Sequence, residues 1–218
     1  MTLSLYFHPL SSFSWKALIP LYEAGIAFEP KVVNPGDPAS LAAFHAVWPL
    51  GKFPVLRDDE RGLTIPESTI IIEYLAQHHP AARGLIPTDP DQAQLVRLKD
   101  RLIDSYIHLR MQQIVGDRLR PEDKRDPFGM DQARDGIRKA YDLIEPMIEG
   151  PLAMGETFTL VDCAALPALF YADYCVPLSG WPALADYLEE LKARPSVARV
   201  LREAQPYFQY FPLAGEKA

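Results

Sequence analysis

Two adjacent serines stand where the first helix is expected to begin, and their hydroxyls could carry chemistry. Ser11 and Ser12 follow a strand-like stretch and a Pro-containing break. Serine at such a position usually caps the helix. A hydroxyl there could instead donate a hydrogen bond to a bound thiolate, helped by the partial positive charge of the helix N-terminus. Lowering a thiol pKa of about 8.5 by about two units takes roughly 2.7 kcal/mol, which is the order of magnitude of these two effects together.

A second helix start carries Glu67 and Ser68, directly ahead of an apolar run at residues 69–75. The serine is usually only a cap. A helix N-terminus with a free hydroxyl is also a site for a carboxylate, and the neighbouring Glu67 could take an ammonium group. The pair therefore suits the zwitterionic end of an α-amino acid.

Pro54 lies inside the apolar strand pattern of residues 53–56. Because proline cannot donate to a ladder, the ordinary interpretation is an edge strand or a strand start. A cis peptide bond between Phe53 and Pro54 would instead turn the backbone of Phe53 outward, where its N–H and C=O could pair with an extended ligand. Few X-Pro bonds are cis, so the residues alone favour the ordinary interpretation.

The elements that position these residues form an α/β pattern over residues 1–79. Leu3, Leu5 and Phe7 alternate with polar residues as a strand does, and the helix that follows ends at Gly25. The next elements are a strand at 28–33, a short helix at 41–47, a hairpin at 53–65 and a helix at 69–75. The order βαβαββα predicts one parallel strand pair, one antiparallel hairpin and helices packed on the sheet.

Residues 80–90 have Pro and Gly at both ends and predict a linker to an all-helical domain at 91–218. Apolar residues recur at a helical period in this domain, over the longest stretch at 92–119. Thr159 and Asp162 are spaced like a capping box at the start of an almost wholly apolar helix. We expect that helix at the centre of the second domain.

Composition narrows the classes of function. The 218 residues are 48% hydrophobic and 23% charged, and the net charge of -7 argues against a nucleic-acid partner. No apolar run reaches the length of a membrane span and the first residues lack a signal-peptide pattern, so we expect a cytoplasmic protein without membrane association. Two cysteines, Cys163 and Cys175, cannot form a disulfide framework or a four-ligand zinc site, and no metal is expected.

In chain order these motifs resemble the cytosolic glutathione transferase family, and the resemblance covers essentially the whole chain. Its most specific parts are residues 51–56, 66–75 and 158–162. The run Ser-Ser-Phe-Ser-Trp-Lys at 11–16 is most similar to the serine-type zeta and theta classes. The zeta class has Ser-Ser-Cys-Ser-Trp-Arg in the matching run.

The resemblance implies a thioredoxin-like N-terminal domain that binds glutathione and an all-helical C-terminal domain that shapes the second-substrate pocket. Ser11 becomes the hydroxyl that stabilises the thiolate, with Ser12 and Tyr6 as alternatives. The other implied contacts are Lys52 for the glycine carboxylate, the Phe53 backbone ahead of cis Pro54 for the cysteinyl part, and Glu67 and Ser68 for the γ-glutamyl end.

Five residues of the second domain complete the predicted site. Asp104 matches a position where several classes have an aspartate that reaches glutathione across the dimer, and a solvated carboxylate is the alternative. We expect Tyr106, Arg110, Phe208 and Phe211 to line the second-substrate pocket, although aromatic residues at helical spacing are more often core.

The resemblance implies a homodimeric enzyme that conjugates glutathione, its co-substrate, to a small hydrophobic electrophile without a metal. A glutathione-dependent isomerase of the maleylacetoacetate isomerase kind, or a dehalogenase, would use the same thiolate. Phe13 in place of the zeta-class cysteine weakens the isomerase alternative. A non-catalytic binding or regulatory protein is the alternative from another class, since a fold does not fix a function.

Overall fold

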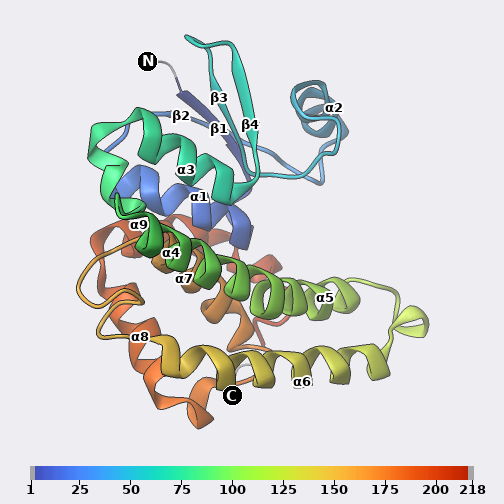
Figure 1. Ribbon diagram of the computed structural model, residues 1–218. Helices are drawn as coiled ribbons and strands as arrows, with labels where there is room; N and C mark the ends of the chain where they lie inside the picture. Colours follow the sequence, from blue (N-terminus) through green and yellow to red (C-terminus); the bar gives the residue numbers. More distant parts are fainter. Residues whose placement is uncertain (1–2, 216–218) are drawn as a thin grey trace.

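The computed structural model describes residues 3–215, and its N-terminal part is built on a four-stranded sheet. The strands β1 (Leu3–Phe7), β2 (Glu29–Val32), β3 (Val55–Asp58) and β4 (Leu63–Pro66) lie in the order β2-β1-β3-β4. β1 and β2 are parallel, whereas β3 is antiparallel to both of its neighbours. Helices α1 (Ser12–Glu23), α2 (Pro38–Val47) and α3 (Ser68–His78) complete the predicted order βαβαββα (Figure 1).

The two faces of β1 are covered by different helices, because successive side chains of a strand point to opposite faces. Leu3, Leu5 and Phe7 are buried in the core that includes residues of α1 and α3. Tyr6 points to the other face, where its ring stacks on Phe44 of α2 at a centroid distance of 5.9 Å. The sheet is thus enclosed between α2 on one side and α1 with α3 on the other.

The rest of the chain is helical, as predicted. Its α-helices are α4 (Pro90–Leu102), α5 (Leu109–Arg118), α6 (Pro127–Ile144), α7 (Leu160–Ala172), α8 (Pro182–Ala193) and α9 (Pro195–Ala204). The short 3-10 segments are η1 (Pro80–Leu85), η3 (Glu122–Lys124), η4 (Glu145–Met147), η5 (Leu178–Gly180) and η6 (Gln205–Tyr210). The long helix expected at 92–119 is present as α4, a π-helical turn η2 (Ile103–His108) and α5 in direct succession. π-helical turns are rare and occur frequently at functional sites.

Helix α7 lies at the centre of the helical domain, as its apolar sequence predicts. All of its residues except Phe170 are buried. Thr159 and Asp162 form the predicted capping box at its start. The Asp162 carboxylate also accepts hydrogen bonds from the Ala153 backbone N–H at 3.0 Å and the Tyr187 hydroxyl at 2.7 Å, which ties α7 to the preceding loop and to α8.

Helix α1 joins the two domains, because it packs against α7 and α9 as well as against α3. One buried apolar core extends through both domains, and Trp15 of α1 lies within it with no exposed surface. The next residue, Lys16, is equally buried although it is charged, so it requires partners inside the protein. No helix within residues 3–215 combines the length and the apolarity needed to cross a membrane.

Candidate active site

Ser11 caps helix α1 and lies at the junction of two cavities. Its Oγ accepts a hydrogen bond from the Ser14 backbone N–H at 3.1 Å. This bond uses an acceptor lone pair of the hydroxyl, so the proton of Ser11 stays free to donate to a bound group. The side chain is half-buried and lines both cavities.

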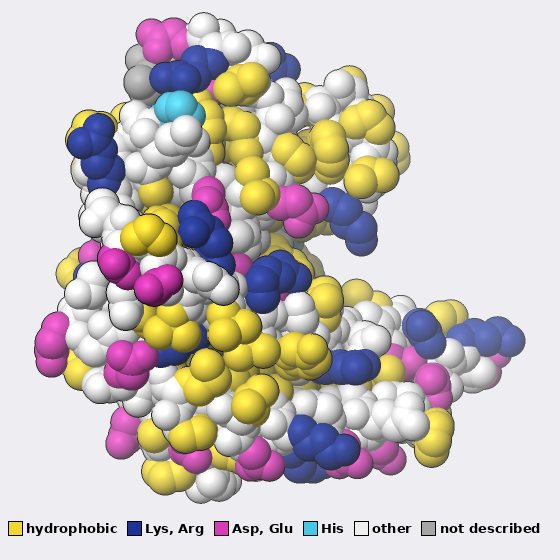
Figure 2. Space-filling view, viewed as in Figure 1, with side chains coloured by type: hydrophobic (Ala, Val, Ile, Leu, Met, Phe, Trp, Pro, Cys, Tyr) yellow, Lys and Arg dark blue, Asp and Glu magenta, His cyan; other side chains and the backbone are white. Residues whose placement is uncertain are grey.

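The first cavity, which we call the polar cavity, has a volume of about 520 Å³. Its lining brings together Ser11, Lys52, Phe53, Pro54, Glu67 and Ser68, which sequence analysis assigned to one ligand. Trp48 and Phe13 add apolar surface to the same cavity. In the space-filling view the surface is deeply notched between the lobe that carries α2 and the arm formed by α5 and α6 (Figure 2).

Glu67 has an unusual backbone conformation at the edge of the polar cavity. Its φ of 68° is the only positive φ of a non-glycine residue among residues 3–215. Such strained positions cluster at ligand sites, where the surrounding structure holds them. Glu67 precedes the first turn of α3, and no side chain caps that helix start. The N–H groups of this turn are therefore available to an anion in the cavity.

Phe53 and Pro54 line the polar cavity directly ahead of β3. The peptide bond that joins them is cis, as the resemblance implies. Phe53 lies outside the β1–β3 ladder, whose register begins at Val55, so that ladder does not use its N–H and C=O groups. Its side chain is half-buried and lines both cavities.

The second cavity, which we call the apolar cavity, has a volume of about 260 Å³. Apolar and aromatic side chains supply most of its lining, among them Met111 and Val115 of α5, Leu119 directly after α5, Tyr171 of α7 and Phe211 near the C-terminus. None of the described residues that line it is a Lys, Arg, Asp or Glu. His8 is its one ionisable imidazole, and burial lowers the pKa of that ring.

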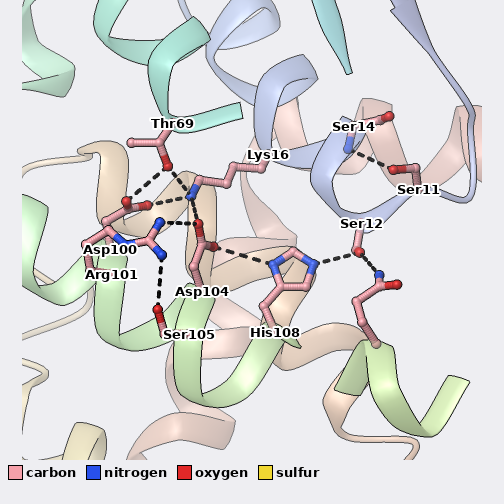
Figure 3. A network of polar contacts seen from close by, with 11 residues as sticks. Ser11, Ser12, Ser14, Lys16, Thr69, Asp100, Arg101, Asp104, Ser105 and His108 are labelled. Atoms are coloured by element: carbon pink, nitrogen blue, oxygen red, sulfur yellow. Dashed lines mark hydrogen bonds and ion pairs between the residues drawn. The ribbon is translucent and has the colours of Figure 1, made fainter. Parts of the chain in front are cut away.

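A buried polar network joins α1 and α3 of the first domain to α4 and η2 of the helical domain (Figure 3). The Lys16 ammonium donates to Asp100 at 2.6 Å, to Asp104 at 2.7 Å and to the Thr69 hydroxyl at 2.8 Å. Burial by itself would raise the pKa of the Asp104 carboxyl, but the contact with His108 and the charge of Lys16 outweigh it and lower that pKa to about 2. Asp104 is thus a buried, ionised carboxylate and not the solvated one considered from the sequence.

His108 connects this network to the second serine of α1. Its Nε2 lies 2.6 Å from the Ser12 hydroxyl, and its Nδ1 faces Asp104 at 3.5 Å (Figure 3). The Phe13 ring stacks on the imidazole with 3.8 Å between centroids. Gln112 Nε2 donates a second hydrogen bond to Ser12 at 2.8 Å. Burial lowers the pKa of His108, which favours the neutral ring.

Five predicted site residues lie away from both cavity linings, and one of them is Asp104, which is held in the buried network. Tyr6 packs against α2, and Tyr106 is 53% exposed on the surface. Arg110 is exposed and bonded to Gln113. Phe208 packs in an aromatic cluster with Trp15, Tyr171 and Phe211, and of the predicted pocket residues only Phe211 reaches the apolar cavity.

Sequence analysis missed Lys16, His108 and Gln112. A signal was present for part of this set, because Asp104, His108 and Gln112 are spaced four residues apart and share one face of a helix. Lys16 carried no local signal, since its carboxylate partners lie more than 80 positions away in the chain.

A four-stranded sheet of this order, joined through α1 to a helical domain with a shared cleft, defines a thioredoxin-like protein with a C-terminal helical domain. Family models match the chain at both domains: glutathione S-transferase, N-terminal domain, at residues 5–83, and glutathione S-transferase, C-terminal domain, at residues 127–190. The chain belongs to the glutathione S-transferase family.

Several known proteins are similar to this chain over nearly its full length. Maleylacetoacetate isomerase of Mus musculus is 29% identical over 196 residues, which cover 87% of each chain. A probable maleylacetoacetate isomerase of Vibrio cholerae is 29% identical over 217 residues, which cover 94% of this chain and 98% of the relative. The solved structure of a glutathione transferase homologue from Sulfitobacter, with bound glutathione, has a TM-score of 0.80 and 26% identity and covers 93% of this chain and 98% of that one.

Proposed function

We propose that this protein is a glutathione transferase that conjugates the glutathione thiol to a small hydrophobic electrophile. The observation that carries the proposal is that the polar and apolar cavities share Ser11, Phe53 and Gln112 in their linings. A ligand that fills the polar cavity and ends in a thiol at Ser11 would place its sulfur at the opening of the apolar cavity. An electrophile there would lie within reach of that sulfur.

The polar cavity offers a partner for each end of glutathione. The free N–H groups at the start of α3 suit the γ-glutamyl carboxylate, and Glu67 suits its ammonium group. The backbone of Phe53 suits the cysteinyl peptide group, and the exposed Lys52 suits the glycine carboxylate. A Sulfitobacter homologue with bound glutathione supports this assignment of the ligand.

The chemistry that follows is nucleophilic attack by a stabilised thiolate. The Ser11 hydroxyl, with its proton free, donates to the sulfur anion, and the N-terminus of α1 contributes a further favourable field. Tyr6 is separated from both cavities, which favours Ser11 over Tyr6 for this role.

A glutathione-dependent cis–trans isomerase is the second candidate, because relatives over nearly the whole chain bear the name maleylacetoacetate isomerase. That substrate carries carboxylates, which bind best to cationic side chains. The described lining of the apolar cavity has no Lys or Arg, and Phe13 stands in place of the zeta-class cysteine. These features favour an uncharged electrophile over the isomerase substrate. A dehalogenase is a further alternative, since it would use the same thiolate.

We further propose that two copies of this chain form a homodimer through β4, α3 and α4. β4 is an edge strand of the sheet, and its Leu63 is 43% exposed. Ile70 of α3 and Leu98 of α4 are also exposed, and apolar side chains reach the surface over β4 and along the helices below it (Figure 2). A second copy would cover this open edge and its apolar neighbours.

Three measurements separate the candidate functions. Retention on a resin that carries glutathione tests binding, and a non-catalytic protein that keeps only the fold would not be retained. Conjugation of chlorodinitrobenzene tests transferase activity, and isomerisation of maleylacetone tests the isomerase. Retention with conjugation exceeding isomerisation is the expected result. Retention with isomerisation alone would replace the transferase by the isomerase.

A further inference from the structure

The Ser12 hydroxyl has an environment that simple helix capping does not explain. It is 2% exposed and lies beside Ser11 in the wall of the apolar cavity. The helix cap is supplied by Ser11, so Ser12 is not needed for it. Its Oγ instead contacts two side chains of the helical domain, His108 at 2.6 Å and Gln112 at 2.8 Å. The Gln112 amide nitrogen is the donor in its contact.

The position of Asp104 fixes which nitrogen of His108 carries the proton. His108 Nδ1 and Asp104 Oδ1 are both buried without a hydrogen-bond partner, and they face each other at 3.5 Å. An ionised carboxylate only accepts hydrogen bonds, so Nδ1 must be the protonated nitrogen. Nε2 of the neutral ring is then an acceptor, and the Ser12 hydroxyl donates to it.

The charges around His108 suit a base whose imidazole is neutral before the proton is transferred. Asp104 on its own helix favours its protonation, whereas Lys16 of α1 opposes it and is itself held by Asp100. The Phe13 ring stacks on one face of the imidazole, and the Ser12 hydroxyl contacts its Nε2. Burial lowers the pKa of His108, which favours the neutral ring, and the lone pair of its Nε2 then faces the Ser12 hydroxyl as an acceptor.

We propose that His108, acting through Ser12, accepts the proton that leaves the glutathione thiol. In this step the S–H bond breaks and its proton passes to Ser12 Oγ, while the original Ser12 proton passes to His108 Nε2. The products are a thiolate that accepts a hydrogen bond from Ser12 and an imidazolium paired with Asp104. The thiolate that forms nearby favours the positive charge on the ring, so the two charges arise together. His108 is thereby a positioning residue for the thiol chemistry, and the inference rests on glutathione as the ligand.

Proton counting on ligand binding tests this relay without any measurement of turnover. Calorimetric titration of the full chain with glutathione, in neutral buffers of different ionisation enthalpy, gives the number of protons released per site. S-methylglutathione, which has no thiol, supplies the baseline for all other groups. The ultraviolet absorbance of the thiolate shows in parallel whether the sulfur is ionised. We expect thiolate in the wild type with far less than a full proton released per site, because the proton stays on His108.

His108→Gln keeps a side chain that can bond to Ser12 but cannot hold the proton. We expect this variant either to lose about two thirds of the thiolate absorbance, as a rise of about one unit from a thiol pKa of about 6.5 would cause at neutral pH, or to release a full proton for each thiolate. Ser14→Ala, which removes a buried hydroxyl of the same helix outside the relay, should keep the wild-type count. A full proton released by the wild type, or a His108→Gln protein identical to it in both measurements, would overturn the relay. Absence of binding by both ligands would instead remove the proposed function.

Discussion

Replacing Ser11 by alanine removes a helix cap and a hydroxyl donor at once, and the two losses can be measured separately. The Oγ of Ser11 accepts from the Ser14 N–H at 3.1 Å, which is the capping bond of α1. Loss of such a cap to alanine costs about 1 kcal/mol of stability, whereas replacement by glycine costs only a few tenths of a kcal/mol. Ser11→Gly therefore removes the hydroxyl while it spares most of the cap.

The loss of the hydroxyl proton acts on the bound thiol. A hydrogen bond to a charged group contributes about 1.5–3 kcal/mol. Its loss should raise the pKa of the bound glutathione thiol by about one to two units. At neutral pH the thiolate population, and with it the rate of conjugation, should fall roughly 3- to 25-fold in both variants if the wild-type thiol pKa is about 6.5. Glutathione affinity should change much less, because the contacts proposed for Lys52, Phe53 and Glu67 in the polar cavity do not involve Ser11.

Two measurements separate these effects. Titration of the thiolate absorbance of the glutathione complex against pH gives the thiol pKa for wild type, Ser11→Ala and Ser11→Gly. Urea unfolding of the same proteins gives the cost of the cap. A shared rise in thiol pKa with a larger stability loss in Ser11→Ala is the expected pattern. An unchanged thiol pKa in both variants would show that Ser11 is only a cap and would transfer its role to Ser12.

Three further outcomes follow from the structure. Lys16→Met leaves two buried carboxylates without their ammonium and should lower the free energy of unfolding, measured by urea titration, by about 3–5 kcal/mol. Arg97→Met is the control: it breaks an exposed ion pair and should lower the same free energy by at most about 1 kcal/mol. The folded pKa of Asp104, lowered to about 2, lies below its unfolded value of about 3.9, so its contribution to stability is present above about pH 4 and is lost as the pH falls toward 2. Asp104→Asn should accordingly lose less of its stability than wild type between those pH values, and an equal loss would contradict the assignment. Ile70→Glu would bury an unpaired charge in the proposed dimer interface and should give a monomer in sedimentation experiments, and a monomeric wild type would refute the proposed interface.

The sequence predicted the fold well wherever buried residues recur at a regular spacing within one helix or strand. Side chains alternate in β1 as expected of a strand, and α7 is apolar along its length because nearly the whole helix is buried. The capping box of Thr159 and Asp162 was predictable because its residues are only three positions apart. The cis bond before Pro54 was different. A proline alone favours the trans form, and only the resemblance of the surrounding motif indicated the isomer that the structure contains.

The candidate pocket was harder to predict because it depends on helical phase. Tyr106 of η2 and Arg110 of α5 lie on one face of this continuous helix, but its side chains that line the apolar cavity include Met111 and Val115, which lie one position further round the helix. A helix advances by about 100° per residue, so an error of one position turns a side chain away from the cavity. The π-helical turn adds a further local change of phase that periodicity does not reveal.

The rod formed by α4, η2 and α5 also limits how this protein can be recombined with its relatives. These three helices in succession provide the carboxylates that hold Lys16, the imidazole and amide that contact Ser12, and part of the lining of the apolar cavity. A chimera that exchanged the helical domain to acquire a new substrate range would replace the supports of the thiol site together with the pocket. Successful chimeras should therefore carry α1 and this rod from the same parent.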